Sequence, residues 1–91
     1  MAVSEIVFRK SVARDLRTIP KQDVARILQR IEALRDDPRP PGCEKLTGSD
    51  RYRIRQGVYR ILYEIRSARE GLTLTIIVVK VGHRSRVYRS S

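Results

Sequence analysis

The sequence predicts an α+β fold in which an N-terminal strand and a two-helix hairpin precede three or four antiparallel strands. Three observations predict it. The chain has 91 residues, 41% of them hydrophobic, which suits one domain over residues 1–91 and is too apolar for a disordered basic tail. Apolar residues recur at helical spacing in the first half and at strand spacing in the second. A proline-rich stretch separates the halves. We expect both helices to pack on one face of a twisted sheet.

The first half contains the predicted strand and helices. Residues 4–9 form the strand, and Ser11 is expected to cap a short helix over residues 12–18. Pro20 suits the first turn of a second helix, where its missing N–H costs nothing. The segment DDPRPPGC at 36–43 ends that helix and forms an extended loop. One stripe of the second helix is apolar: Val24, Ile27, Leu28, Ile31 and Leu34.

The second half has the alternation of strands. Strands are predicted at 52–55, 58–65 and 72–81, with a turn at Gln56-Gly57 and a polar loop at 66–71. The third strand is rich in β-branched residues and apolar on both faces, as a central strand would be. Gly82 is expected to end it, and the basic tail HRSRVYR that follows could add an edge strand.

Alternation also predicts which side chains share a face. The helix-facing set is Tyr52, Ile54, Tyr59, Ile61, Tyr63, Ile65, Ile77, Val79 and Val81. The opposite, helix-free set is Arg53, Arg55, Arg60 and Lys80. Like charges on one sheet face repel unless an anion joins them, so this set predicts a phosphate-binding surface. The alternative interpretation is a row of solvated guanidinium groups on an open face.

Charge indicates the class of partner. The chain has 20 Lys and Arg against 10 Asp and Glu, a net charge of +10. The excess is +3 over residues 1–45 and +7 over residues 46–91, and the second half holds all four tyrosines. A basic half with interspersed tyrosines favours a nucleic-acid partner. Basic residues do not line one face of an amphipathic helix, so a membrane partner is not expected.

Several other classes are excluded by composition. No apolar run approaches the length of a membrane span, and the first ten residues lack the apolar stretch of a secretory signal, so we expect a cytoplasmic protein. The single cysteine, Cys43, cannot form an internal disulfide. One cysteine and one histidine cannot build a structural zinc site. No metal and no cofactor are expected.

The remaining chemistry is that of cations, a phenol and an imidazole. Such groups suit RNA cleavage, in which the 2′-hydroxyl attacks the adjacent phosphate and the protein stabilises charge and moves protons. Tyr88 is flanked by Arg84, Arg86 and Arg89, cations that favour its phenolate form and make it the candidate base. His83 is a candidate general acid, or a residue whose place after the glycine has no catalytic meaning.

Two segments resemble a known family. YRIRQGVYRILYEI at 52–65 and VVKVGHRSRVYR at 78–89 are similar to the RelE-type toxins of the RelE/ParE superfamily, and the LTG turn at 46–48 falls in order between the helices and strands. The resemblance implies a RelE-like fold. It also implies the toxin of a type II toxin–antitoxin pair, which cuts messenger RNA in the ribosomal A site by the 2′-hydroxyl route.

The resemblance assigns roles by position. Arg60 would stabilise the transition-state phosphate, Tyr88 would take the proton from the 2′-hydroxyl, and Arg84 would stabilise the phosphate or the departing 5′-oxygen. Arg53 and Arg55 stand where family members have lysines; as permanent cations they would act electrostatically, and His83 is the candidate to replace the missing proton donor. Further basic residues are expected to contact RNA: Arg39, Lys45, Arg51, Lys80 and Arg86.

The resemblance also implies partners. These are the 70S ribosome with its messenger RNA and a RelB-like antitoxin, whose acidic C-terminal segment would wrap the basic toxin. A second branch of the superfamily consists of ParE toxins, which inhibit gyrase without nuclease activity. A third possibility is a nucleic-acid or operator-binding module without catalysis. The joint presence of Arg60, Arg84 and Tyr88 favours the nuclease.

Overall fold

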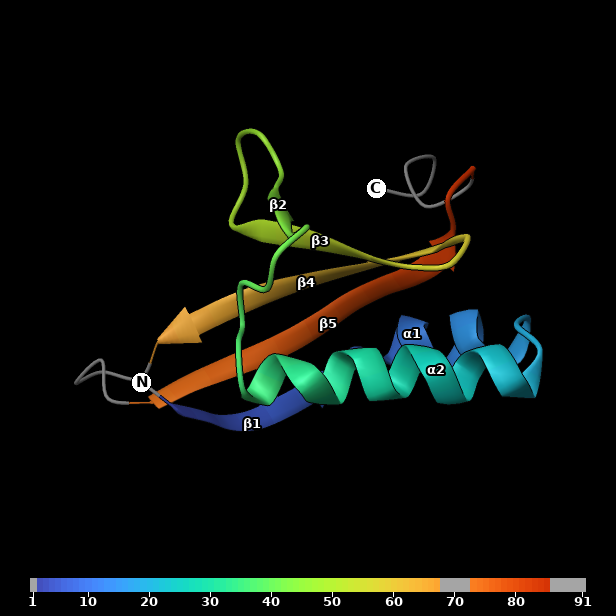
Figure 1. Ribbon diagram of the computed structural model, residues 1–91, viewed down its shortest axis with the longest axis horizontal. Helices are drawn as coiled ribbons and strands as arrows, with labels where there is room; N and C mark the ends of the chain where they lie inside the picture. Colours follow the sequence, from blue (N-terminus) through green and yellow to red (C-terminus); the bar gives the residue numbers. More distant parts are fainter. Residues whose placement is uncertain (1, 68–72, 86–91) are drawn as a thin grey trace.

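A computed structural model describes residues 2–67 and 73–85. A strand and two helices precede four further strands, as Figure 1 shows. The elements are β1 (Ala2–Phe8), α1 (Lys10–Arg17), α2 (Lys21–Glu32), a 3₁₀ turn (Ala33–Arg35), β2 (Glu44–Lys45), β3 (Arg51–Gln56), β4 (Tyr59–Ser67) and β5 (Thr73–His83). The predicted α+β fold is confirmed. No helix in these described ranges is long and apolar enough to cross a membrane.

The five strands form one mixed sheet in the order β1-β5-β4-β3-β2. Strands β3, β4 and β5 pair with one another in antiparallel order, as predicted. Strand β2 is antiparallel to β3, and β1 pairs in parallel with β5. The continuous apolar sequence of β5 serves both faces of the sheet, because some of its side chains enter the main core and others a small apolar cluster on the opposite face. The short strand β2 was not expected, since its two residues lie within a segment with no alternation of its own.

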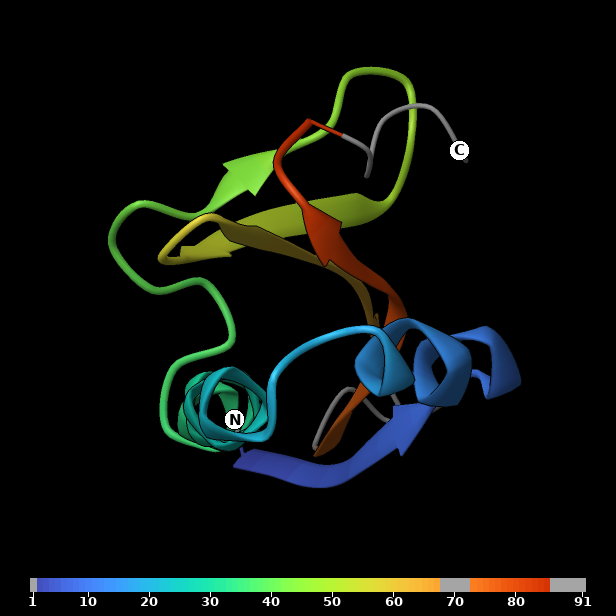
Figure 2. The same ribbon diagram turned by 90° about the vertical axis from the view of Figure 1, so that its right-hand side faces the viewer.

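Helix α2 lies against one face of the sheet, and α1 lies beside the C-terminal half of β5 (Figure 2). Ile27, Ile31 and Leu34 of the predicted stripe are buried, whereas Leu28 is 40% exposed. Ser11 is not the cap of α1. The helix begins at Lys10 with Arg9 in the N-cap position and no side-chain capping bond, and Pro20 occupies the N-cap of α2, one position before its first turn.

The predicted faces of β5 are wrong in part because the strand contains a bulge. Leu62 of β4 pairs with Lys80 while Tyr63 pairs with Val78, so Val79 is an additional residue between two paired positions. Ile76, Val78 and Val81 therefore belong to the core under the helices. Val79 and Ile77 instead join Leu62 and Leu46 in a small apolar cluster on the opposite face. A simple count of alternation cannot anticipate an inserted residue.

The two long hairpin strands bring the second half of the chain together. Gly57 lies in the turn between β3 and β4 with φ of 60°, a conformation that L residues rarely adopt. Gly82 does not end β5, contrary to expectation: it pairs with Arg60, and the strand continues to His83 opposite Tyr59. Cross-strand hydrogen bonding here places the basic end of β5 beside the start of β4.

Candidate functional site

A group of arginines lies on the helix-free face of the β3–β4 hairpin, toward its turn. Arg55 lies directly opposite Arg60, and Arg53 lies opposite Leu62. Residues that face each other across antiparallel strands project to the same side of the sheet. This side is opposite the main core, because the alternate residues Ile54 and Ile61 are buried there. The structure thus brings together Arg53, Arg55 and Arg60, as the alternation predicts.

Arg84 approaches the same group from the end of β5. Its backbone N–H donates to the carbonyl oxygen of Val58 at 2.8 Å, which extends the β4–β5 pairing by one step. Partial burial lowers the pKa of Arg60, and the positive charges of three neighbours lower it further: Arg55, Arg53 and Arg84. An arginine remains protonated even so. The four residues are hereafter called the Arg60 cluster.

The Arg60 side chain is held by its own hairpin. Its Nη1 donates to the carbonyl oxygens of Tyr59 at 3.1 Å and Gly57 at 3.4 Å. Within the described part of the chain these contacts use one nitrogen, so Nη2 and Nε remain as donors for a ligand. A guanidinium with two adjacent donors matches the oxygens of a phosphate.

Glu44 of β2 balances part of this charge. Its carboxylate forms a short ion pair with Arg53 and a longer one with Arg55, at 3.8 Å. The Arg53 side chain is only 16% exposed, and that of Arg55 is 62% exposed. Sequence reasoning missed Glu44 because nothing in its local pattern predicts that a two-residue strand places it beside β3. The cluster keeps a net positive charge even with this carboxylate.

His83 is not brought to the Arg60 cluster. It pairs with Tyr59, so its ring lies on the helix side of the sheet, edge-on to the Tyr59 ring with 6.2 Å between centroids. Its Nδ1 lies 2.9 Å from the hydroxyl of Ser85 and accepts the backbone N–H of that residue at 3.2 Å. Of the two interpretations of His83, this geometry favours the positional one.

Tyr88 and Arg86 lie outside the described residues, so their predicted roles stay predictions. The three other tyrosines are engaged elsewhere. Tyr52 accepts a hydrogen bond from Arg39 Nε at 3.1 Å. Tyr59 donates to Asp23, and burial together with that carboxylate raises its pKa. Burial is also the main cause that raises the pKa of Tyr63. A raised pKa makes a phenol a poorer base at neutral pH.

The additional predicted RNA contacts fall into two groups. Arg39 stacks over the Tyr52 ring at 5.3 Å, and Lys45 pairs with Tyr52 in the β2–β3 ladder, so both belong to the helix side of the sheet. Arg51 lies on the same face as the Arg60 cluster but pairs with Glu64 at 3.3 Å. Lys80 forms an ion pair with Asp15 of α1 at 3.1 Å and is not part of the cluster.

The arrangement has a limited chemical repertoire. A set of fixed guanidinium groups binds a phosphodiester and stabilises added negative charge on it. Within residues 2–67 and 73–85, no group of three or more His, Cys, Asp or Glu side chains is placed to hold a metal ion. Proton transfer at this site would depend on a further residue, and Tyr88 is the one that the sequence nominates.

Comparison with known protein families assigns the chain to a family of toxins. The family described as ParE toxin of type II toxin–antitoxin system, parDE, matches residues 6–88. The chain belongs to this ParE toxin family. It is therefore a toxin of a type II toxin–antitoxin system within the RelE/ParE superfamily. A comparison with curated protein sequences found no match.

Solved structures similar to this ParE-family toxin include RelE proteins and a YoeB/ParE toxin from Agrobacterium tumefaciens, which shares the fold at 18% identity with a TM-score of 0.71, covering 87% of this chain and 97% of that one. The RelB–RelE complex of Methanococcus jannaschii matches with 29% identity and a TM-score of 0.69, covering 92% of this chain and 96% of that one. The RelE–RelB complex of Pyrococcus horikoshii matches with 28% identity and a TM-score of 0.72, covering 96% and 100%. A mutant of E. coli RelE in the free state shares the fold at 23% identity, with a TM-score of 0.71 and coverage of 98% and 93%.

Proposed function

We propose that this toxin is a metal-independent endoribonuclease that cleaves messenger RNA in the ribosomal A site and thereby inhibits translation. The observation that carries the proposal is the convergence of the four arginines of the Arg60 cluster on one sheet face. Similarity to RelE structures agrees with it. The site of action would be the cytoplasm, where ribosomes translate.

The proposed reaction needs no external nucleophile. The RNA 2′-oxygen forms a bond to the adjacent phosphorus, the bond from phosphorus to the 5′-oxygen breaks, and the products are a 2′,3′-cyclic phosphate and a 5′-hydroxyl. Tyr88 accepts the 2′-hydroxyl proton. Arg60 stabilises the additional charge on the phosphorus centre, and Arg84 stabilises the departing 5′-oxygen, which takes its proton from water. His83, on the other face, has a positional role.

Arg53 and Arg55 hold the substrate in this scheme. Both are permanent cations, so they bind the phosphates on either side of the scissile bond and transfer no proton. Glu44 keeps their guanidinium groups oriented before RNA arrives. Holding the strand in line is itself worth several orders of magnitude in rate when the reacting atoms are within about 3–3.5 Å.

The partner that blocks this site is proposed to be a RelB-like antitoxin with an acidic C-terminal segment. The similar archaeal RelE structures are complexes with RelB. The +10 net charge of the present toxin favours an acidic segment that becomes ordered on binding. Such a segment over the Arg60 cluster would exclude RNA by occupying the same donors.

The test is toeprinting of a defined message in a purified translation system. The wild-type toxin is expected to produce new stops within A-site codons only when ribosomes are present. Arg60→Ala should lower the cleavage rate by about 10²–10³-fold, the cost of removing one donor to transition-state charge, and Tyr88→Phe should also abolish most activity. His83→Gln is the matched variant and should keep cleavage within about threefold. The proposal would be refuted if wild-type toxin that arrests growth left the transcripts intact in this system.

A second candidate function is inhibition of gyrase, which the ParE description of the matching family favours. It predicts gyrase trapped on cleaved DNA while messages stay intact. The two functions are separated by running the gyrase cleavage assay and the toeprint on the same preparation. Binding to nucleic acid with neither outcome would identify a module without catalysis.

A further inference from the structure

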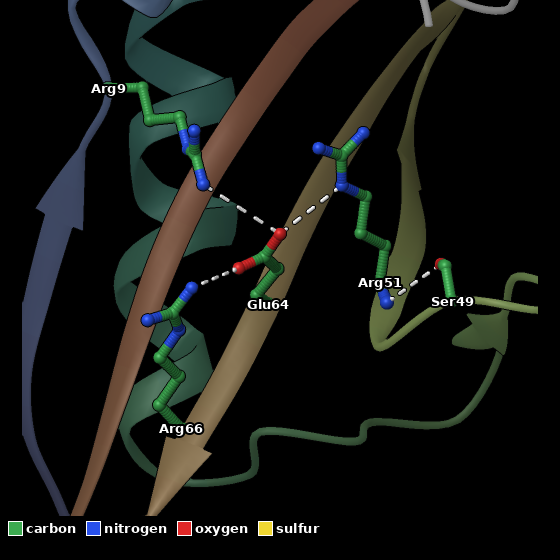
Figure 3. A network of polar contacts seen from close by, with 5 residues as sticks. All are labelled: Arg9, Ser49, Arg51, Glu64 and Arg66. Carbon is green, nitrogen blue, oxygen red and sulfur yellow. Dashed lines mark hydrogen bonds and ion pairs between the residues drawn. The ribbon is translucent and has the colours of Figure 1, made fainter.

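Glu64 gathers three arginines at the opposite end of the helix-free face from Arg60. Figure 3 shows its carboxylate between them, with one oxygen 3.3 Å from Arg51 Nε and 3.8 Å from Arg9 Nη2. The other oxygen is 3.2 Å from Arg66 Nη2. The Glu64 side chain is 13% exposed, whereas the arginines are 37–64% exposed. A largely buried carboxylate thus pairs with three arginines that are partly exposed to solvent. Glu64 and its partners Arg9, Arg51 and Arg66 are hereafter called the Glu64 cluster.

The three arginines come from separate parts of the fold. Arg9 follows β1 and reaches across β5, Arg51 begins β3, and Arg66 lies near the end of β4 (Figure 3). The backbone N–H of Arg51 also donates to Ser49 Oγ at 3.0 Å, which fixes the start of β3. Arg9 and Arg51 are far from Glu64 in the sequence, so only the folded sheet brings them to this carboxylate. Their common point of contact is one carboxylate.

The cluster retains the capacity to bind an anion. Its net charge is about +2 when Glu64 is ionised, and burial of that carboxylate is outweighed by hydrogen bonds from Arg51 and Arg66, so its pKa lies below the usual value. Within the described residues, each guanidinium uses one nitrogen for Glu64. The remaining N–H groups are donors that phosphate oxygens would accept.

A row of arginines connects this cluster with the Arg60 cluster. Arg51, Arg53 and Arg55 occupy alternate positions of β3 and project to one face, at a spacing of about 7 Å. That spacing is close to the distance between successive phosphates of an extended RNA strand. Along β4, Glu64 is four residues from Arg60, or about 13 Å. The two clusters are therefore too far apart for one phosphate and well placed for two phosphates of one strand that are separated by a third.

We propose that Glu64 is a positioning residue that holds Arg9, Arg51 and Arg66 as a second phosphate-binding site for the RNA strand cleaved at the Arg60 cluster. The inference rests on the proposed function for the identity of the strand. A bare group of three arginines would repel and spread apart. The carboxylate keeps them converged before the ligand arrives, which reduces the entropy lost on binding.

The first test compares two double variants with the same net charge. Arg51→Gln with Arg66→Gln removes two members of the Glu64 cluster, and Arg17→Gln with Arg26→Gln removes two exposed arginines from α1 and α2. The probe is a 20-nucleotide single-stranded 2′-O-methyl RNA, which lacks the attacking hydroxyl. We expect the cluster variant to bind at least tenfold more weakly and its salt slope to fall by about 0.7, as for one lost phosphate contact. Equal losses in both variants would overturn the inference.

The second test measures RNA binding by Glu64→Gln, for which two explanations predict opposite changes in affinity. If only total charge mattered, removal of a negative charge would strengthen RNA binding. If Glu64 positions the arginines, the variant binds severalfold more weakly although its net charge is higher. Circular dichroism and thermal unfolding establish that the variant is folded. If it is not, the comparison of the two double variants decides alone.

Cleavage kinetics separate this inference from the proposed function. The Arg51→Gln, Arg66→Gln variant should raise the toxin concentration that gives half-maximal cleavage by the same factor as its dissociation constant. Arg60→Ala should act on the maximal rate instead. Wild-type toxin that leaves messages intact defeats the nuclease proposal, while the binding comparison with 2′-O-methyl RNA still decides whether the Glu64 cluster binds a strand.

Discussion

At the scale of single residues, burial makes Tyr63 a packing residue and not a proton acceptor. Tyr63 is fully buried, and its hydroxyl donates to the carbonyl oxygen of Pro38 at 2.6 Å and lies 3.4 Å from Cys43 Sγ. It ties the proline-rich loop to the core. Burial and the contact with Cys43 both raise its pKa, so it serves packing and not proton transfer. This also places the single cysteine: its thiol packs beside a phenol at the border of the core.

Glu64 supplies a prediction about pH at the same scale. Its pKa is lowered in the folded protein because hydrogen bonds and charges of arginines outweigh burial. A carboxyl group with a lowered folded pKa contributes stability that is complete above its unfolded pKa, about 4.3, and is lost as the pH falls through the folded value. The stability advantage of wild type over Glu64→Gln should therefore be constant between pH 6 and 8.

The advantage should shrink below about pH 4.5 and disappear at lower pH. Urea unfolding of both proteins over pH 2.5–8 measures it, and the difference between them cancels the titration of the other carboxyl groups. An advantage that grows on acidification would contradict the assigned ion pairs.

At the scale of elements, α1 protects the edge of β5 beyond the point where β1 ends. The last β1 residue, Phe8, pairs with Val78. Farther along β5, Asp15 of α1 accepts the backbone N–H of Val81 at 3.1 Å and pairs with Lys80 at 3.1 Å. A side chain thus replaces the missing neighbouring strand, which satisfies an edge that would otherwise be open.

This contact predicts an ordered series of stabilities. Asp15→Ala leaves the Val81 N–H without its acceptor, and the cost should be about 1–3 kcal/mol. Asp15→Asn keeps an oxygen that accepts the Val81 N–H, but it removes the negative charge that pairs with Lys80. Its free energy of unfolding should therefore fall between those of Asp15→Ala and wild type. Urea unfolding gives the order, and hydrogen exchange of the Val81 amide should be fastest in Asp15→Ala. An unchanged exchange rate in that variant would remove Asp15 from this role.

At the scale of the whole molecule, the two faces of the sheet segregate the arginines of β3 and β4 from the apolar side chains of the main core. The helix-free face carries Arg53, Arg55, Arg60 and the Glu64 cluster, and the other face carries the apolar contacts with α2. A polyanion is therefore expected to bind one side of the sheet. In the described part of this face, the carboxylates of Glu44 and Glu64 form ion pairs with neighbouring arginines, and the arginines outnumber them, so the surface stays positive.

A steep salt dependence of ribosome binding follows from this segregation. Release of counterions from three phosphates, the scissile one and one on either side of it, corresponds to a slope of about −2 in a plot of log affinity against log salt concentration. Arg55→Ala removes the partner of one flanking phosphate, so its binding to 70S ribosomes between 50 and 300 mM salt should show a slope shallower by about 0.7. A flat response in the wild-type toxin would mean that contacts other than phosphates dominate.

The sequence by itself determined the class of fold, the long helix and the row of arginines on β3 and β4, because these depend on local periodicity and alternation. It also carried the resemblance to the superfamily. Only the tertiary structure decided the faces of β5, where Val79 forms a bulge, and the position of His83 on the far side of the sheet from Arg60. The same holds for the contacts of Glu44, Glu64 and Asp15, each of which meets partners from other elements. Periodicity describes one segment at a time, whereas inserted residues and ion pairs between distant segments depend on how the strands and helices register against one another.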